Sequence, residues 1–259
     1  MTSQHVQSAI ATSFKKLHQP GNPVVVVNVW DAASAQAAAS VPGVKALATA
    51  SYAVAATYGV KDNDLTYEEN MAAVAKIAPV AQQHNLPLTV DFQDGYLDDI
   101  AKAVTELIQL GAVGANIEDL NDRTGKMRPK QEAVDRIRAA TEAAKAAGVD
   151  DFVINARTDI IGEGGTIEDA IDRGRAFLDA GATTVFVWGG GSRGLRDAEV
   201  LKIVKALDGR LSVVLPGSTE YLTVSEVKKM GVARVSIGPR LQFDAARAIK
   251  AGIEELLST

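Results

Sequence analysis

Cysteine is absent from this 259-residue sequence, histidine occurs only three times, and lysine and arginine form no dense run. Without cysteine, the chain cannot form disulfides, thiolate zinc sites or a cysteine nucleophile. The formal net charge of −5 and the missing basic run argue against a nucleic-acid partner, because a phosphate backbone is bound by a concentrated positive surface.

Long hydrophobic runs are missing as well. No apolar stretch approaches the roughly 20 residues that span a bilayer, and residues 1–19 form an amphipathic segment without the continuous apolar core of a signal peptide. The sequence therefore predicts no membrane contact and a cytoplasmic location.

The sequence does contain a regular alternation of short β-branched runs with Ala-rich helical stretches. The runs expected as strands are residues 24–29, 44–49, 86–92, 113–119, 151–157, 183–188, 211–216 and 233–238. The clearest helical stretches between them are Tyr67–His84, Asp98–Leu110, Gln131–Ala147 and Ile167–Ala180. Continuous apolar strands joined by helical crossovers predict a parallel sheet covered by helices.

About eight such units, without a linker rich in proline, glycine or serine, predict one domain over residues 1–259. The fold class that fits is a single (β/α)8 barrel of the TIM type with a short N-terminal helix, and a doubly wound open sheet is the alternative. In a barrel, the carboxyl ends of the strands form the active-site face, so the residues that end each strand are the candidate functional residues.

Acids gather at the ends of the third to fifth strands, as in the stretch "VDFQDGYLDD". Asp91 and Glu118 lie inside apolar runs, where a carboxylate is costly unless it is paired, hydrogen-bonded or bound to a cation. Adjacent strand ends could bring both acids to one shared cation, with Arg157 beside it. Oxygen ligands without histidine or cysteine suit Mg²⁺ or Mn²⁺.

Several of these strand-end residues also have structural interpretations. Asp94 and Asp98 are placed to cap the following helix, Asp98 more clearly so, and Asp119 is ambiguous in the same way. Arg157 either contacts a ligand or pairs with Asp159, because a partly buried arginine is usually paired.

The remaining strand ends offer few residues that could take part in catalysis. None ends in lysine, which argues against a Schiff-base aldolase. Trp188 suits the wall of a pocket. The glycine-rich segments 162–165 and 188–194 lack the spacing of phosphate-binding motifs, so we expect both to be flexible loops.

The motifs "VDFQDGY", "NIED", "INARTD" and "GVKDND", in their order along the chain, resemble the isocitrate lyase/phosphoenolpyruvate mutase superfamily. The resemblance spans roughly residues 24–240. It implies a barrel whose last helix is commonly exchanged between subunits of a tetramer. It further implies Mg²⁺, a small 2-oxo or 2-hydroxy carboxylate as substrate, and an enolate of the pyruvate type.

The resemblance also implies a metal site. Asp91 matches the direct metal ligand, while Glu118 and Asp62 match groups that hold metal-bound waters. Gln93 departs from the pattern, which has an acid here. Its side-chain oxygen can still accept a hydrogen bond from a metal-bound water, so we expect weaker metal binding rather than none.

For the substrate, the resemblance implies that Arg157 is the anchoring arginine, and that the turn at Ser51 and Tyr52 cradles a carboxylate and an oxyanion. The loop at 121–129 lacks the KKCGH motif of the isocitrate and methylisocitrate lyases, so this chain looks like a short-loop member. With Gly125 as a hinge and Arg123 and Lys126 as candidate cations, that loop is placed to close over the substrate.

The resulting functional hypothesis is a Mg²⁺-dependent lyase or hydrolase that cleaves a C–C bond of a small 2-oxo or 2-hydroxy (di)carboxylate. C–P bond chemistry of the same superfamily and an inactive carboxylate-binding barrel are the alternatives. A homo-oligomer, dimer or tetramer, is expected, and the apolar face of the last helix, Phe243 to Leu257, is compatible with a subunit contact.

Overall fold

The predicted strands form a parallel barrel whose first strand bridges both edges of the sheet. The computed structural model describes residues 3–190, 194–215 and 222–258. The sheet order is β1-β11-β10-β9-β8-β5-β4-β3-β2, and every pair in it is parallel. The predicted strand 24–29 splits into β1, which pairs with β11, and β2, which pairs with β3. The barrel prediction is therefore confirmed, and the open sheet is excluded.

The barrel strands are β1 (Val24–Val25), β2 (Val27–Val29), β3 (Leu47–Thr49), β4 (Leu88–Asp91), β5 (Gly114–Glu118), β8 (Val153–Thr158), β9 (Thr184–Val187), β10 (Leu211–Val214) and β11 (Arg234–Ser236). The α-helices are α1 (Ser3–Lys16), α2 (Ala32–Ala39), α3 (Ser51–Tyr58), α4 (Tyr67–Gln83), α5 (Ile100–Gln109), α6 (Lys130–Ala146), α7 (Ile167–Asp179), α8 (Asp197–Ala206), α9 (Val224–Met230) and α10 (Arg240–Leu257). A small antiparallel hairpin, β6 (Leu120–Asn121) and β7 (Lys126–Met127), follows β5.

The helices end where the sequence predicts, because glycine follows them in the left-handed conformation that other residues avoid. Gly111, Gly148 and Gly181 have φ values of 103°, 76° and 108°, respectively. The predicted cap of α5 was wrong by one residue: Asp99, not Asp98, accepts the Lys102 N–H at 3.0 Å.

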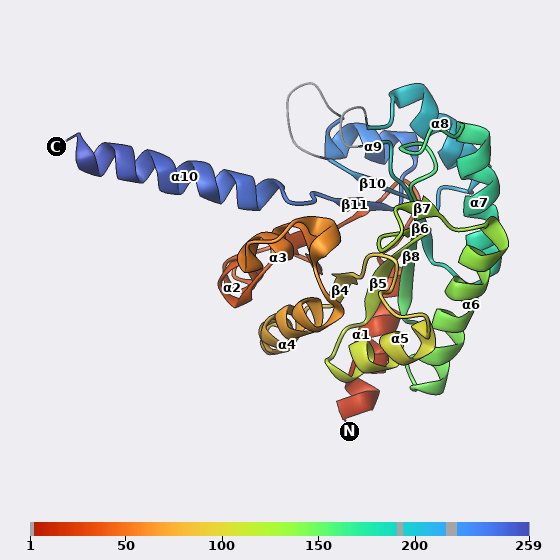
Figure 1. The fold of residues 1–259 in the computed structure, drawn as a ribbon, viewed down its shortest axis with the longest axis horizontal. Helices are drawn as coiled ribbons and strands as arrows, with labels where there is room; N and C mark the ends of the chain where they lie inside the picture. Colours follow the sequence, from red (N-terminus) through yellow and green to blue (C-terminus); the bar gives the residue numbers. More distant parts are fainter. Residues whose placement is uncertain (1–2, 191–193, 216–221, 259) are drawn as a thin grey trace.

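The helices surround the barrel, and α1 covers its N-terminal end (Figure 1). Phe14 of α1 is fully buried there, with its ring centroid 6.0 Å from the guanidinium of Arg234, the first residue of β11. Apolar side chains fill most of the core, whereas Asn28 and Asn155 are buried polar residues on barrel strands. Polar side chains thus occur inside the barrel as well, and a barrel of this kind carries its site at the carboxyl ends of its strands.

Helix α10 extends away from the barrel (Figure 1), and no residue of it is buried within the described chain. Its exposed apolar side chains are Leu241, Phe243, Ile249, Ile253, Leu256 and Leu257. No helix in the described ranges is long and apolar enough to cross a membrane.

Two sequence features are only partly covered. Residues 191–193 of the second glycine-rich segment, and Pro216 and Ser218 at the end of the seventh predicted strand, lie outside the described residues. The segment 162–165 belongs to a turn after β8, and a Cβ on Gly162 would lie 2.9 Å from the Trp188 ring, so glycine is needed for this close approach.

Candidate active site

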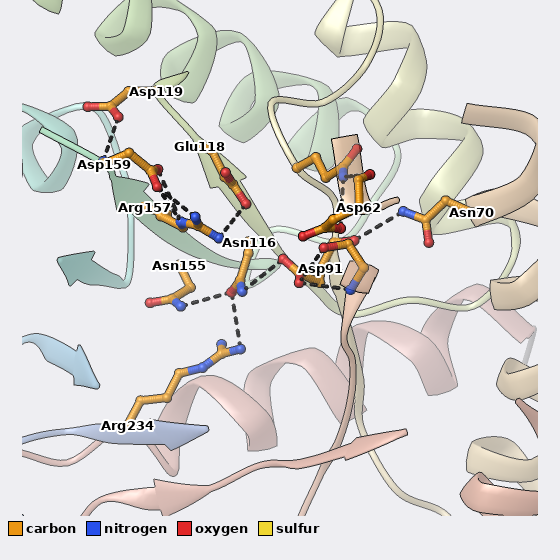
Figure 2. Close-up of polar contacts among 12 residues, drawn as sticks. Asp62, Asn70, Asp91, Asn116, Glu118, Asp119, Asn155, Arg157, Asp159 and Arg234 are labelled. Carbon is orange, nitrogen blue, oxygen red and sulfur yellow. Dashed lines mark hydrogen bonds and ion pairs between the residues drawn. The ribbon is translucent and has the colours of Figure 1, made fainter. Parts of the chain in front are cut away.

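Asp91 ends strand β4 at the mouth of the barrel, and three donors fix its carboxylate. Ser51 donates its backbone N–H and its hydroxyl to Oδ2 at 3.0 and 3.1 Å, and the Asn116 amide donates to Oδ1 at 3.3 Å (Figure 2). Ser51 begins helix α3, and the N-cap residue, Ala50, offers no side-chain acceptor. Asp91 therefore caps α3 from a neighbouring strand, and the positive end of the helix dipole stabilises its charge.

Asp62 is the second acid at this mouth. It begins a short 3-10 helix, Asp62–Asp64, after α3. Burial raises the pKa of Asp62, and the negative charge of Asp91 raises it further. The Gln93 amide donates to the Asp62 backbone oxygen at 2.8 Å and to its Oδ1 at 3.2 Å. Gln93 has a φ of 45°, which few non-glycine residues adopt, so a strained turn places this amide against the acid.

Arg157, near the end of β8, is held between acids and aromatic rings. It donates to Glu118 Oε1 at 2.7 Å from Nη1, and to Asp159 at 2.6 Å from Nη2 and 3.0 Å from Nε. Its guanidinium lies 4.9 Å from the Trp188 ring centroid and 5.6 Å from that of Phe186. Burial alone would lower the pKa of Arg157, but the charges of Asp159 and Glu118 outweigh it and raise the pKa. The ion pair with Asp159 is therefore confirmed, and the guanidinium stays charged and oriented.

The two acids of the "ED" motif have different partners. Burial raises the pKa of Glu118, and the Arg157 charge offsets part of this effect. Asp119 accepts the backbone N–H of Asp159 at 2.9 Å and pairs with Arg173 at 3.1 Å. Asp119 thus fixes the segment after β8 rather than facing the mouth, while Glu118 contacts Arg157.

Asp62, Asp91 and Arg157 line one cavity of about 530 Å³. Its polar lining consists of Asn28, Ser51, Asp62, Asp91, Asn116, Arg157 and Ser236. The rest of its lining includes Tyr52, Phe186, Val187, Trp188, Leu195, Val213, Val214, Leu215, Leu222, Pro239 and Phe243. The cavity therefore combines two acids and an arginine with a largely apolar lining, and Trp188 forms part of its wall as the sequence predicts.

Gln93, Glu118, Arg123 and Lys126 are not among the residues that line this cavity. Arg123 pairs with Asp98 at 2.5 Å on the outside of the hairpin β6–β7, and Lys126 is exposed on the same hairpin. Gly125 has a φ of 63° in its turn. Closure of this hairpin over a substrate stays a prediction.

Two polar residues near the site, Asn70 and Asp122, were not singled out from the sequence. Asn70 of α4 is fully buried and donates to the Asp91 backbone oxygen at 3.0 Å and to the Tyr96 hydroxyl at 2.9 Å. Oδ2 of Asp122, on the hairpin, is buried without a hydrogen-bond partner in the described chain, and burial and the Asp94 charge raise the pKa of Asp122 to about 7. Asp94 itself pairs with Arg128 at 2.5 Å instead of capping α5. One polar residue on an otherwise apolar helix face, such as Asn70, gives no signal by itself.

The oxygen donors at the mouth fit a hard cation. Among the residues that the structure describes, no three His, Cys, Asp or Glu side chains form a group that could hold a metal by themselves. Asp91 and Asp62, however, repel one another, and a divalent cation would relieve that repulsion. Mg²⁺ usually keeps several waters and takes only one or two carboxylates, so this donor set suits it.

A parallel (β/α)8 barrel with acids and an arginine around one cavity at the carboxyl ends of its strands defines an enzyme of the barrel class. Residues 14–257 match the model of the phosphoenolpyruvate phosphomutase family. The chain therefore belongs to that family, and the resemblance to the isocitrate lyase/phosphoenolpyruvate mutase superfamily is confirmed.

Individual relatives include carbon–carbon lyases and hydrolases. The 2-methylisocitrate lyase of Escherichia coli (strain K12) is 33% identical over an alignment of 192 positions that covers 66% of this chain and 62% of that enzyme. The crystal structure of a Burkholderia cenocepacia J2315 protein has a TM-score of 0.84 at 35% identity, over 95% of this chain and 99% of that one. The structure of an oxaloacetate acetylhydrolase has a TM-score of 0.82 at 27% identity, over 95% and 86% of the two chains.

Proposed function

We propose that this protein is a Mg²⁺- or Mn²⁺-dependent lyase or hydrolase that splits a C–C bond of a small 2-oxo or 2-hydroxy (di)carboxylate, with oxaloacetate-type compounds as the leading candidates. The observation that carries the proposal is that Asp91, Asp62 and Arg157 line one cavity. Cation-binding oxygens and a fixed guanidinium are what a carboxylate with a developing enolate oxygen requires.

Asp91 is the direct metal ligand in this proposal. Asp62, Glu118 and Gln93 hold metal-bound waters. A bound Mg²⁺ would supply a Lewis acid for the substrate's oxygens. Asp91 suits its role because its two oxygens are already oriented by Ser51 and Asn116.

Arg157 and the start of α3 hold the substrate. Nε and one hydrogen on each terminal nitrogen of Arg157 serve Asp159 and Glu118, which leaves a second hydrogen on each of Nη1 and Nη2 for a carboxylate. The turn at Ser51 and Tyr52 adds the positive end of a helix dipole. When the C–C bond breaks, its electron pair passes into the enolate, and these fixed positive groups stabilise the charge.

The hairpin β6–β7 completes the proposal as a lid. Arg123 and Lys126 would approach the substrate only after a movement, since both are exposed in this structure. Such a movement would exclude water from the cavity and strengthen the electrostatic interactions inside it.

A homo-oligomer, dimer or tetramer, is part of the proposal, with residues 1–259 as one domain in each subunit. Helix α10 supports it, because a projecting helix with six exposed large apolar side chains, from Leu241 to Leu257, needs a covering surface. Exchange of α10 between subunits would provide that surface.

C–P bond chemistry is the alternative, favoured by the description of the family whose model matches. A barrel that only binds a carboxylate is the second alternative, favoured by the neutral Gln93. A turnover assay distinguishes C–C cleavage, C–P chemistry and an inactive barrel. We would incubate the protein with Mg²⁺ and with oxaloacetate, 2-methylisocitrate or a 2-oxo phosphonate, and measure pyruvate, oxalate and inorganic phosphate.

We expect pyruvate or oxalate, whose formation stops with EDTA and in Asp91→Ala. It should persist in Asp135→Ala, which removes an exposed acid paired with Arg138 on helix α6, outside the cavity. Phosphate release would favour the C–P alternative. Carboxylate binding without any product would favour the inactive barrel.

A further inference from the structure

Arg234 is a buried arginine that the proposed chemistry does not use. It begins β11, its side chain is 1% exposed, and its guanidinium lies over the Phe14 ring inside the barrel. In the described part of the chain, its Nε and Nη1 have no hydrogen-bond partner. Burying a cation with so few partners is costly, so packing alone is a poor account of an arginine at this position.

The charge of Arg234 persists despite this burial. Burial lowers the pKa of Arg234 to about 10, and the negative charge of Asp91 offsets part of the effect. The side chain is therefore still a cation at neutral pH, and Asp91 is the acid whose field reaches it.

One hydrogen-bond chain connects the two residues. Arg234 Nη2 donates to Asn116 Oδ1 at 3.3 Å, and Asn116 Nδ2 donates to Asp91 Oδ1 at 3.3 Å (Figure 2). Asn155 Nδ2 also donates to Asn116 Oδ1, at 2.8 Å. An amide could face either way, but arginine has donors only, so Arg234 and the Asn155 amide together hold the oxygen of Asn116 inward and its NH₂ toward Asp91.

We propose that Arg234 is a positioning residue that acts through Asn116 to hold the carboxylate of Asp91 in its cation-binding orientation. The inference rests on the metal site of the proposed function. Without Arg234, the Asn116 oxygen keeps only the donor of Asn155, so the Asn116 amide is held less firmly and its hydrogen bond to Asp91 Oδ1 weakens. Outer partners of this kind commonly change metal affinity 10–100-fold.

The direction in which Arg234→Met changes cation affinity distinguishes the positioning role from a role of charge alone and a role of packing alone. If Arg234 acted only through its charge, Arg234→Met would tighten cation binding, because a nearby positive charge repels the metal. If it acted only through packing, a folded Arg234→Met would bind metal normally and merely melt earlier. Positioning predicts weaker binding although a positive charge has been removed.

The test is a titration of the purified full-length protein with Mn²⁺ alone, with free Mn²⁺ followed by electron paramagnetic resonance and folding checked by circular dichroism. We expect the dissociation constant to rise by about tenfold or more in Arg234→Met. Thr105→Val is the matched control, since it removes the hydrogen bond from the Thr105 hydroxyl to the Ala101 oxygen on helix α5, outside the chain from Arg234 to Asp91. It should bind Mn²⁺ as the wild type does.

A second arm keeps the test decisive if Arg234→Met does not fold. Arg234→Lys retains the charge, but its shorter side chain cannot span a contact that is already 3.3 Å long, so binding should again weaken. In addition, Arg234→Met should have no further effect in an Asn116→Leu background, because both changes break the same chain.

Unchanged or tighter Mn²⁺ binding in folded Arg234→Met, or unchanged binding in Arg234→Lys, overturns the positioning role. Additive effects of Arg234→Met and Asn116→Leu on the Mn²⁺ dissociation constant would also overturn the positioning role. If the wild type binds Mn²⁺ and Asp91→Ala does not, the proposed metal site stands whatever Arg234 does. If the wild type binds no Mn²⁺, both proposals fail.

Discussion

Gln93 donates its side-chain amide to Asp62 at two points, the backbone oxygen at 2.8 Å and the carboxylate at 3.2 Å. The superfamily pattern has an acid at this position, and an acid could only repel Asp62 unless a cation lay between them. The neutral amide therefore stabilises an acid-rich mouth when no metal is bound.

Gln93→Glu should lower the stability of the metal-free protein and raise its affinity for the metal. Loss of the hydrogen bond and the added repulsion should lower the free energy of unfolding in EDTA by about 1–3 kcal/mol. The extra charge should make the Mn²⁺-induced rise in melting temperature larger than in the wild type. Gln93→Leu is the control, because it loses the hydrogen bond without adding charge. Equal metal-induced shifts in Gln93→Glu and the wild type would count against a water-binding role at this position.

His18 should make the protein sensitive to acid. Burial, and the nearby charge of Arg234, lower the pKa of His18 from 6.5 to about 3. Between these two values the unfolded chain binds a proton that the folded protein excludes, so stability is full above about pH 6.5 and falls as the pH drops toward 3. At pH 5 the loss relative to pH 8 should be about 2 kcal/mol.

The measurement is urea unfolding of the wild type and His18→Asn at pH 5 and pH 8. Asparagine can keep the hydrogen bond to the Phe14 carbonyl, which the His18 ring makes at 2.9 Å. The variant should lose less stability between the two pH values than the wild type, whereas His84→Asn, at a partly exposed position, serves as the control for loss of an imidazole. An identical pH dependence in His18→Asn and the wild type would contradict this role.

Helix α10 should determine the assembly. Ile249 and Ile253 lie one turn apart on the same face and are 65% and 51% exposed. Ile249→Glu/Ile253→Glu should convert a dimer or tetramer into monomers in light scattering coupled to gel filtration, because buried charges without partners destabilise an interface. Lys250→Glu, which also changes the charge of the helix, is the control. A monomeric wild type, or an assembled double variant, would refute the interface.

The barrel and its helices could be predicted because each strand and helix carries its own periodic signal, bounded by glycine. Asp91 and Arg157 could be found because strand ends meet at one face of any such barrel. Other contacts depend on three-dimensional proximity that no local pattern encodes. Asn70, on helix α4, contacts the end of β4. Arg234 donates to Asn116, although the two residues are 118 positions apart in the sequence.

The sequence of the strand that carries Arg157 is compatible with both a structural and a functional role for this residue. The structure shows the ion pair with Asp159 and adds a second one with Glu118, yet Arg157 also lines the cavity. A lysine offers a point charge without the planar fork, so Arg157→Lys cannot serve both acids and a ligand at once. A buried carboxylate left without a partner should lower the free energy of unfolding by about 1–3 kcal/mol.

Ligand binding then distinguishes the anchor from a purely structural ion pair. If Arg157 anchors the substrate, folded Arg157→Lys should bind oxalate or pyruvate at least about tenfold more weakly in calorimetry with Mg²⁺ present, because the bidentate contact is lost. Asp159→Asn keeps the shape of its side chain and the guanidinium, so it should lower the melting temperature with a smaller effect on affinity. The double variant measures the coupling between Arg157 and Asp159, since non-additive melting shifts report their direct contact. Full oxalate affinity in a folded Arg157→Lys protein would refute the anchor role, and the enolate would then depend on the metal site and the start of α3 for its stabilisation.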